Sequence, residues 1–278
     1  MRIGKFSFHL INDGSFLRDG GCMFGQVPKV SWEEGIKPDR KNRIRLGVNA
    51  FLVRTPDSTI LVDTGAGFKE ADEMKETHGL SAGKLLRRLK DLGVTARDID
   101  TVILTHLHFD HCGGSTRQDR TGKAVPTFPK ATYMVQKAAW EEACNPNERS
   151  KNSFHPDDFL PLMEKGQLRL LDGDSEIMPG VWTRVTGGHC LGHQVVTINP
   201  SGERIAFLGD LIPTPHHIPL QYISAFDQSP QDTLDGKRRF LEMAENEGWL
   251  LIFGHGTDNT AGYLDRRNGE VKFRPVEV

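Results

Sequence analysis

Residues 105–111 read Thr105-His106-Leu107-His108-Phe109-Asp110-His111, and the interpretation of the whole chain starts from them. The cluster begins where the apolar run from Ile99 to Leu104, which we interpret as a buried strand, comes to an end. Side chains two apart on an extended segment face the same way, so His106 and His108 are expected to converge before the chain turns at Gly113-Gly114. This arrangement predicts a metal site at the end of the strand.

Further histidines and a second aspartate follow predicted strands elsewhere in the chain. They stand in Gly188-His189, Leu208-Gly209-Asp210 and Gly254-His255-Gly256. Strand ends at one edge of a sheet can gather catalytic groups from distant parts of a chain onto a rigid frame. Taken singly, each of these residues is more often structural than catalytic. Five histidines and two aspartates at successive strand ends together predict a metal centre.

The types and number of these side chains predict two divalent ions. Imidazole and carboxylate ligands without thiolates suit zinc, and also manganese, iron or cobalt. The first ion is expected to take His106, His108 and His189, the second Asp110, His111 and His255, with Asp210 bridging both. Two neighbouring ions can lower the pKa of a shared water while one of them polarises a substrate oxygen. The reaction class indicated is hydrolysis.

Three residues near the predicted ligands allow other interpretations. His193 competes with His189 as a ligand, but it opens the following predicted strand, where an orienting role is expected. Cys112 and Cys190 each directly follow a predicted ligand, which raises the alternative of a thiolate ligand or a redox switch. Adjacent residues on extended backbone point apart and small buried cysteines are common, so packing accounts for both cysteines adequately.

Size and composition are those of an ordinary enzyme. At 278 residues, with no linker or repeat to divide it, the chain is expected to form a single domain over residues 1–278. A net charge of −2 without a basic stripe argues against nucleic acid as a partner. The start lacks an apolar signal core, and no stretch is long enough to span a bilayer. Scattered cysteines fit a reducing compartment, so we expect a cytoplasmic protein with a small-molecule substrate, either monomeric or a homodimer.

Strand-rich stretches alternate with helices along the chain. Residues 49–54 and 59–63 are predicted to form a hairpin, and the leucine spacing from Ser81 to Leu92 predicts a helix. Later strands are expected near 132–135, 167–171, 181–185, 194–198, 204–209 and 249–253, with a helix over 138–144. Ser229-Pro230 predicts an N-cap and a first helical residue, opening a helix that ends at Gly248. Two such halves predict an α/β (α+β) pair of sheets with helices outside.

These segments together resemble the metallo-β-lactamase superfamily over nearly the whole chain. The resemblance implies a four-layer αββα sandwich that holds a mono- or dinuclear metal site between two sheets. The ligand order of the family maps onto His106, His108, Asp110, His111, His189, Asp210 and His255. In this family the first histidine of the Gly-His-x-x-Gly-His segment is the ligand, which favours His189 over His193. The resemblance also implies that Asp63 supports the metal-binding loop from behind.

Three loops resemble the quorum-quenching lactonase group of this superfamily. They are Asp19 to Lys29, Asn145 to Asn152 and Asp210 to Thr214. The resemblance implies a lactone substrate, such as an N-acyl-homoserine lactone, with Asp110 passing a proton to the departing alkoxide. One departure widens the range of substrates: acyl-homoserine lactonases carry a tyrosine three residues after the bridging aspartate, and this chain has Pro213 there.

Candidate substrate-binding residues lie on two of these stretches, and each has a plain packing alternative. Met23 and Phe24 are candidates for an apolar pocket, and His217 and Tyr222 follow Pro213 closely enough to face it. Other electrophiles of the same fold, phosphotriesters, phosphodiesters and thioesters, stay open because a metal pair activates water without choosing its target. An alternative of another class is a noncatalytic metal-binding or redox-sensing protein that has kept the ligands.

Overall fold

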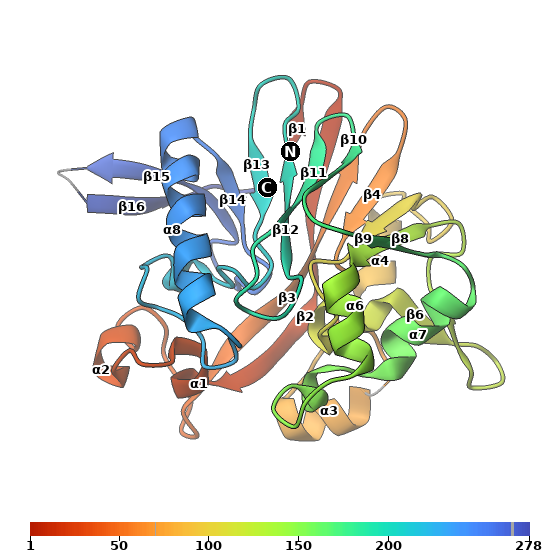
Figure 1. Ribbon diagram of the computed structural model, residues 1–278, viewed down its shortest axis with the longest axis horizontal. Coiled ribbons are helices and arrows are strands. Elements are labelled where there is room, and N and C mark those ends of the chain that lie inside the picture. Colours follow the sequence, from red (N-terminus) through yellow and green to blue (C-terminus); the bar gives the residue numbers. More distant parts are fainter. Residues whose placement is uncertain (70, 268–269) are drawn as a thin grey trace.

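Two sheets of seven strands each form the centre of the protein, in a computed structural model that describes residues 1–69, 71–267 and 270–278 (Figure 1). The first sheet runs in the order β1 (Arg2–Ile3), β2 (Phe6–Asp19), β3 (Arg43–Arg54), β4 (Thr59–Val62), β5 (Thr101–Ile103), β8 (Thr132–Gln136) and β9 (Leu168–Leu171). The second runs β10 (Ser175–Met178), β11 (Val181–Val185), β12 (Gln194–Ile198), β13 (Ile205–Phe207), β14 (Leu250–Ile252), β15 (Ala261–Arg267) and β16 (Glu270–Pro275). A small hairpin pairs β6 (Thr116–Gln118) with β7 (Ala124–Pro126).

Helices cover the outer face of each sheet. The helices α4 (Leu85–Asp91), α6 (Lys137–Cys144) and α7 (Pro156–Glu164) pack on the first sheet, and α8 (Pro230–Glu247) packs on the second. Shorter helices are α1 (Gly20–Phe24), α2 (Lys29–Trp32), α3 (Ala71–His78) and α5 (Phe109–Cys112), with 3₁₀ turns at Gly113–Ser115, Lys151–Ser153 and Pro215–His217. Helix, sheet, sheet and helix therefore follow one another in space, which confirms the predicted αββα sandwich.

Strand alternation divides β3 between two cores. Phe51 and Val53 point into the apolar layer between the sheets, whereas Ala50 and Leu52 point outward against the helices of the first sheet. The Phe51 ring stacks on Phe8 of the same sheet, with centroids 5.8 Å apart, and on Phe207 of the opposite sheet at 6.2 Å. These contacts join the two sheets below the edge from which the predicted ligands project.

Several predicted elements are present, and one helix begins later than expected. The hairpin pairs Phe51 with Val62 in antiparallel register, and Ser229 caps α8 by accepting from the Asp232 N–H. The helix predicted from Ser81 begins at Leu85. The segment before it is not helical, because Ser81 bridges to Ser15 of β2 and the Asp13 carboxylate accepts the Leu85 N–H at 2.7 Å.

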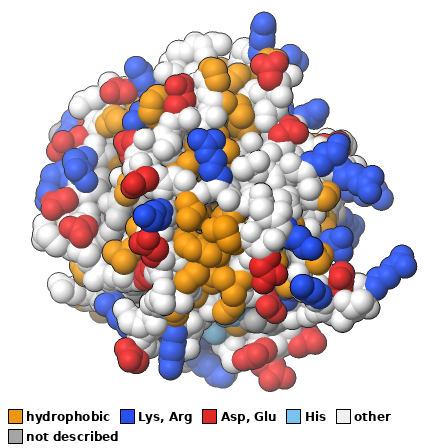
Figure 2. Space-filling view, turned by 45° about the vertical axis from the view of Figure 1, so that its right-hand side comes forward, with side chains coloured by type: hydrophobic (Ala, Val, Ile, Leu, Met, Phe, Trp, Pro, Cys, Tyr) orange, Lys and Arg blue, Asp and Glu red, His pale blue; other side chains and the backbone are white. Residues whose placement is uncertain are grey.

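The surface carries charges of both signs. On the face drawn in Figure 2, basic and acidic side chains are interspersed around an uneven band of hydrophobic ones. Among the helices that the structure describes, none is both long and apolar enough to cross a bilayer. All four cysteines are free thiols, with Cys112 and Cys190 buried and Cys22 and Cys144 exposed.

Replacing Phe51 by alanine tests the packing between the sheets. The change leaves a cavity against two stacked rings, so we expect the free energy of unfolding to fall by about 3–5 kcal/mol in urea titrations. The control is Phe68→Ala, because the Phe68 ring is 57% exposed and its removal should cost about 1 kcal/mol or less. Equal losses for the two variants would contradict the packing described here.

Candidate metal centre

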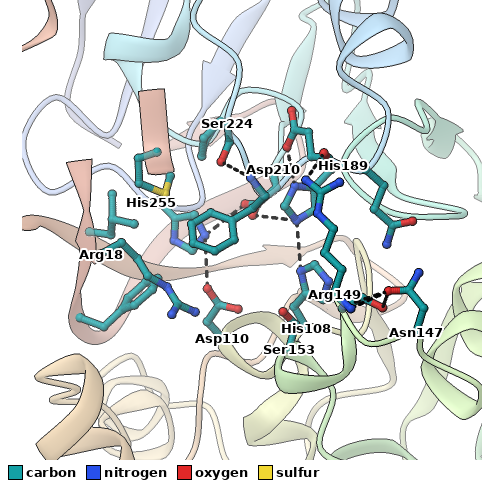
Figure 3. Close-up of a pocket in the computed structure, with 18 residues that line it drawn as sticks. Arg18, His108, Asp110, Asn147, Arg149, Ser153, His189, Asp210, Ser224 and His255 are labelled. Carbon is teal, nitrogen blue, oxygen red and sulfur yellow. Dashed lines mark hydrogen bonds and ion pairs between the residues drawn. The ribbon is translucent and has the colours of Figure 1, made fainter. Parts of the chain in front are cut away.

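All seven predicted ligands meet at one edge of the sandwich. His106, His108, Asp110 and His111 follow β5, in the turn into α5 and in α5 itself. His189 lies in the loop between β11 and β12, Asp210 follows β13, and His255 follows β14. Figure 3 shows His108, His189, Asp110, Asp210 and His255 turned toward a common space. Segments up to 149 positions apart in the sequence, such as those of His106 and His255, are thereby brought together.

Three histidines form a first group. The distance from His106 Nε2 to His108 Nδ1 is 3.0 Å, and that from His189 Nε2 to His108 Nδ1 is 3.1 Å. All three rings are buried. Side chains two apart at the end of β5 therefore converge as the sequence predicted, and His189 closes the group from the second sheet.

A second group lies beside the first, and Asp210 faces both. In the second group His111 Nε2 is 3.1 Å from His255 Nε2, which lies 3.6 Å from Asp110 Oδ2. Asp210 Oδ2 is 3.2 Å from His189 Nε2 of the first group. Asp210 Oδ1 is 3.2 Å from His111 Nε2 and 3.1 Å from His255 Nε2. One carboxylate thus presents an oxygen to each group.

Contacts behind the rings fix which nitrogen carries a proton. The Nδ1 of His255 lies 2.8 Å from the carbonyl oxygen of Gly47, which can only accept, so Nδ1 donates and Nε2 keeps its lone pair. The hydroxyl of Thr105 donates its one proton to Asp63 at 2.9 Å and lies 3.0 Å from His106 Nδ1. That oxygen must accept from His106, which leaves a lone pair on His106 Nε2.

Carboxylates hold two further rings in the same way. Asp227 Oδ1 accepts from His189 Nδ1 at 2.8 Å, and Asp63 Oδ2 accepts from His111 Nδ1 at 2.8 Å. Each ring thus points the lone pair of its Nε2 into the common space. Acceptors then face one another within about 3 Å, and no hydrogen-bond donor among the described residues reaches the buried Asp210 Oδ1. Cations relieve such an arrangement, and imidazole with carboxylate donors suits divalent transition metals.

The comparison with known families agrees with this geometry. The family model of the Metallo-beta-lactamase superfamily matches residues 43–255, a span that holds all seven converging side chains. The chain belongs to the metallo-β-lactamase superfamily.

Several characterised proteins and solved structures are similar to this chain. An N-acyl homoserine lactonase of Bacillus cereus is 26% identical over 260 residues, covering 89% of this chain and 94% of that protein. A solved structure from Staphylococcus aureus, described as a probable metal-dependent hydrolase, is 30% identical, with a TM-score of 0.91 over 100% of this chain and 99% of that one. A dizinc quorum-quenching lactonase, at 22% identity and a TM-score of 0.81 over 100% and 97% of the two chains, shares the fold. The expectation of a metal-dependent hydrolase is confirmed.

Electrostatics keep most of the metallo-β-lactamase site ready to bind cations. Burial, together with the neighbouring imidazoles, lowers the pKa of His106 well below its usual value and that of His108 to about 3, so both rings are neutral donors of a lone pair. Burial also lowers the pKa of His111, but the carboxylates of Asp210 and Asp63 outweigh it and raise that pKa. A proton at His111 therefore competes with a cation for the same position.

His193 and Asp63 lie behind the predicted ligands. His193 Nε2 accepts the Asp210 N–H at 2.9 Å while Nδ1 contacts the Thr186 hydroxyl at 2.6 Å, so both ring nitrogens are engaged away from the common space. Asp63 accepts from the Thr105 N–H at 2.8 Å in addition to its contacts with the Thr105 hydroxyl and His111. These contacts hold the loops that carry the ligands.

The two cysteines beside the ligands are buried in packing positions. Cys112 Sγ lies 3.2 Å from the carbonyl oxygen of Leu107, and burial raises the pKa of both the Cys112 and Cys190 thiols well above the usual value. Neither belongs to a metal-ligand grouping among the described residues. Packing therefore accounts for them better than a thiolate-ligand or redox role.

Only one of the four predicted substrate-binding side chains lines the cavity above the ligands. Met23 does so, whereas Phe24, His217 and Tyr222 lie behind the wall. His217 is engaged through both nitrogens, with Thr214 Oγ1 at 2.8 Å and the Met23 carbonyl oxygen at 2.9 Å. The Phe24 ring stacks on His217 with centroids 4.6 Å apart, and Tyr222 meets Phe24 edge to face. The expectation of pocket contacts for these three is corrected, because they pack together and support the Met23 loop.

Sequence analysis missed several residues of the cavity wall. Asp227, which holds His189, and Phe226 follow no motif, and Arg18 lies on a strand that was not predicted. Asn147 and Arg149 belong to the loop that resembled lactonases, and that likeness was a usable signal for them. Pro213, which stands where the resemblance implies a tyrosine, also lines the cavity and presents carbon to it.

Removing the carboxylate behind His189 should weaken ion binding. In Asp227→Ala the His189 ring loses the acceptor that orients it. We therefore expect the affinity of the weaker of the two metal sites for zinc to fall about 10- to 100-fold in chelator competition. Asp235→Asn, which alters an exposed carboxylate on α8, serves as the matched control. Unchanged affinity in Asp227→Ala would show that His189 needs no such support.

Proposed function

We propose that this protein uses two divalent ions to hydrolyse a lactone or related ester. Zinc is the first candidate for these ions, ahead of manganese, iron or cobalt. The observation that carries the proposal is Asp210, whose two oxygens face two separate groups of lone pairs within 3.2 Å. The similarity of the chain to an N-acyl homoserine lactonase, at 26% identity, makes N-acyl-homoserine lactones the first candidate substrates. A noncatalytic metal-binding or redox-sensing role is less well supported, because the ligand set is complete and the nearby thiols are buried.

The residues of the chain would divide the work between binding and proton transfer. His106, His108 and His189 would hold one ion, Asp110, His111 and His255 the other, and Asp210 both. Bound there, divalent ions supply an activated water and a polarised carbonyl oxygen. The His193 and Asp63 contacts keep the ligands from turning away.

In this proposal Asp110 moves the proton. It is buried, lines the cavity and lies 3.6 Å from His255 Nε2. Burial raises the pKa of Asp110, but the neighbouring imidazoles of His111 and His255 act against it, and the net direction is a lowered pKa. The carboxylate is therefore ionised at neutral pH and can take a proton from the attacking water and deliver it to the departing alkoxide.

The cavity wall suits a substrate with an apolar part. Carbon surface in the lining comes from Phe16, Met23, Leu46, Pro213 and Phe226. With Pro213 in place of a tyrosine, no phenol is available at that position to hold the substrate oxygen. We therefore propose a lactone or ester specificity that differs in detail from that of the acyl-homoserine lactonases.

A substrate panel on metal-loaded protein tests the proposal. We expect zinc-loaded protein to open lactones faster than it cleaves phosphotriesters, phosphodiesters or thioesters, and a chelator to abolish turnover until zinc is restored. His108→Ala and Asp210→Asn should each lower kcat by at least about 100-fold, because each removes a metal donor. His9→Ala, a histidine on β2 outside the cavity lining, is the control. Full activity in both site variants would refute the two-ion mechanism.

We also propose that residues 1–278 act as one domain, in the cytoplasm, on a small molecule. Support comes from the apolar layer shared by both sheets and from four free cysteines, which suit a reducing compartment.

A further inference from the structure

Arg18 extends into the cavity from the end of β2. Phe16 and Arg18 are two positions apart on this strand, so both side chains face the same way, and both line the cavity. In Figure 3 the Arg18 guanidinium lies on the side of Asp110, whereas Asn147 and Arg149 approach from the side of His108. Arg18 is thus a second cation of the wall, separate from the Arg149 loop.

Three aromatic rings hold the Arg18 guanidinium in place. Its central carbon is 5.2 Å from the centroid of the Phe16 ring and 5.4 Å from the centroids of Phe109 and Phe226. Cation–π contacts of this kind restrict where the guanidinium lies but leave its N–H groups unused. The rings therefore position a planar set of donors without satisfying them.

Within the part of the chain that the structure describes, no protein acceptor uses these donors. Over residues 1–69, 71–267 and 270–278, no hydrogen bond or ion pair reaches the Arg18 guanidinium. Arg149, in contrast, donates to the carbonyl oxygens of Ala225 and Asp227 and so ties two loops of the wall together. A half-buried guanidinium that has lost water and gained no acceptor is a costly feature unless a ligand supplies the acceptor.

Charge in the loaded site favours an anionic ligand. Two divalent ions would balance the carboxylates of Asp63, Asp110, Asp210 and Asp227, so the guanidiniums of Arg18 and Arg149 leave positive charge in excess even after one hydroxide is counted. Burial lowers the pKa of Arg18 while the carboxylates of Asp110 and Asp210 act against it, and a guanidinium stays charged at neutral pH.

We propose that Arg18 determines specificity by binding a carboxylate carried by the substrate, so that the enzyme prefers anionic lactones or esters to neutral ones. The proposal rests on the hydrolytic function proposed above. A guanidinium offers two parallel N–H groups that match the two oxygens of a carboxylate. The substrate carboxylate would lie against Arg18, between the rings of Phe16 and Phe226, while the lactone carbonyl faces the metal ligands.

A matched pair of lactones tests this specificity. One is γ-valerolactone, and the other is its analogue in which a carboxylate replaces the methyl group. For wild-type, zinc-loaded protein, kcat/KM should be at least roughly tenfold higher for the carboxylate lactone than for γ-valerolactone. The difference should come from a lower KM for the carboxylate lactone. Arg18→Met should lose that preference through a rise in KM for the anionic lactone, with the neutral lactone changed less than about threefold. Arg18→Lys keeps the charge without the planar fork and should recover part of it.

The control is Arg184→Met. Arg184 also lies over an aromatic ring, 4.4 Å from the centroid of Trp182, but it is exposed and outside the cavity. The Arg184→Met variant should hydrolyse both lactones with the kcat and KM of the wild type. Equal loss for both lactones in Arg18→Met, a lowered metal content in that variant, or no anionic preference in the wild type would each overturn the proposal.

Binding measurements separate a failure of the Arg18 proposal from a failure of the hydrolase proposal. Succinate and butyrate, titrated calorimetrically into zinc-loaded protein, share one carboxylate and differ in the second. Tighter binding of succinate that Arg18→Met abolishes supports the role of Arg18, even if neither lactone is opened and the hydrolase proposal fails. Equal binding of the two acids to the wild type, or an equal loss for both in Arg18→Met, shows that Arg18 recognises no additional carboxylate.

Discussion

The constraint on which the rest of this structure depends is the crowding of unshared electron pairs at one edge of the sandwich. His111 Nε2 and His255 Nε2 lie 3.1 Å apart, and Asp210 Oδ1 is within 3.2 Å of both. Without a metal ion or a proton on His111 these atoms repel one another. The two sheets share a common apolar layer, and its packing holds these side chains close together.

The close approach also requires space that only certain residues leave. Gly209 precedes Asp210 with φ +49°, and a Cβ there would lie 2.7 Å from His193 Nε2, the atom that accepts the Asp210 N–H. A side chain at this position would push His193 away and turn Asp210 out of its place between the two groups. The positions of the predicted ligands therefore depend on the residues behind them and on the glycine before Asp210.

The sequence predicts the parts of the site that rest on local geometry. His106 and His108 are two apart at a strand end, and strand alternation alone brings them together. Phe24 and His217 could not be judged this way, because whether a ring faces the cavity or packs behind its wall depends on segments 193 positions apart meeting in space. Arg18 was missed for a related reason: β2 alternates irregularly around a bulge between Asn12 and Gly14, so its pattern indicates no half-buried strand.

X-ray absorption and anomalous diffraction on zinc-loaded protein test the central claim most directly, since they report the number of ions and the atoms around them. We expect two ions per chain, roughly 3.5–4 Å apart, surrounded by nitrogen and oxygen without sulfur, and joined by the Asp210 carboxylate. A single ion at full loading, sulfur from Cys112 or Cys190 among the ligands, or an Asp210 bound to neither ion would contradict this claim.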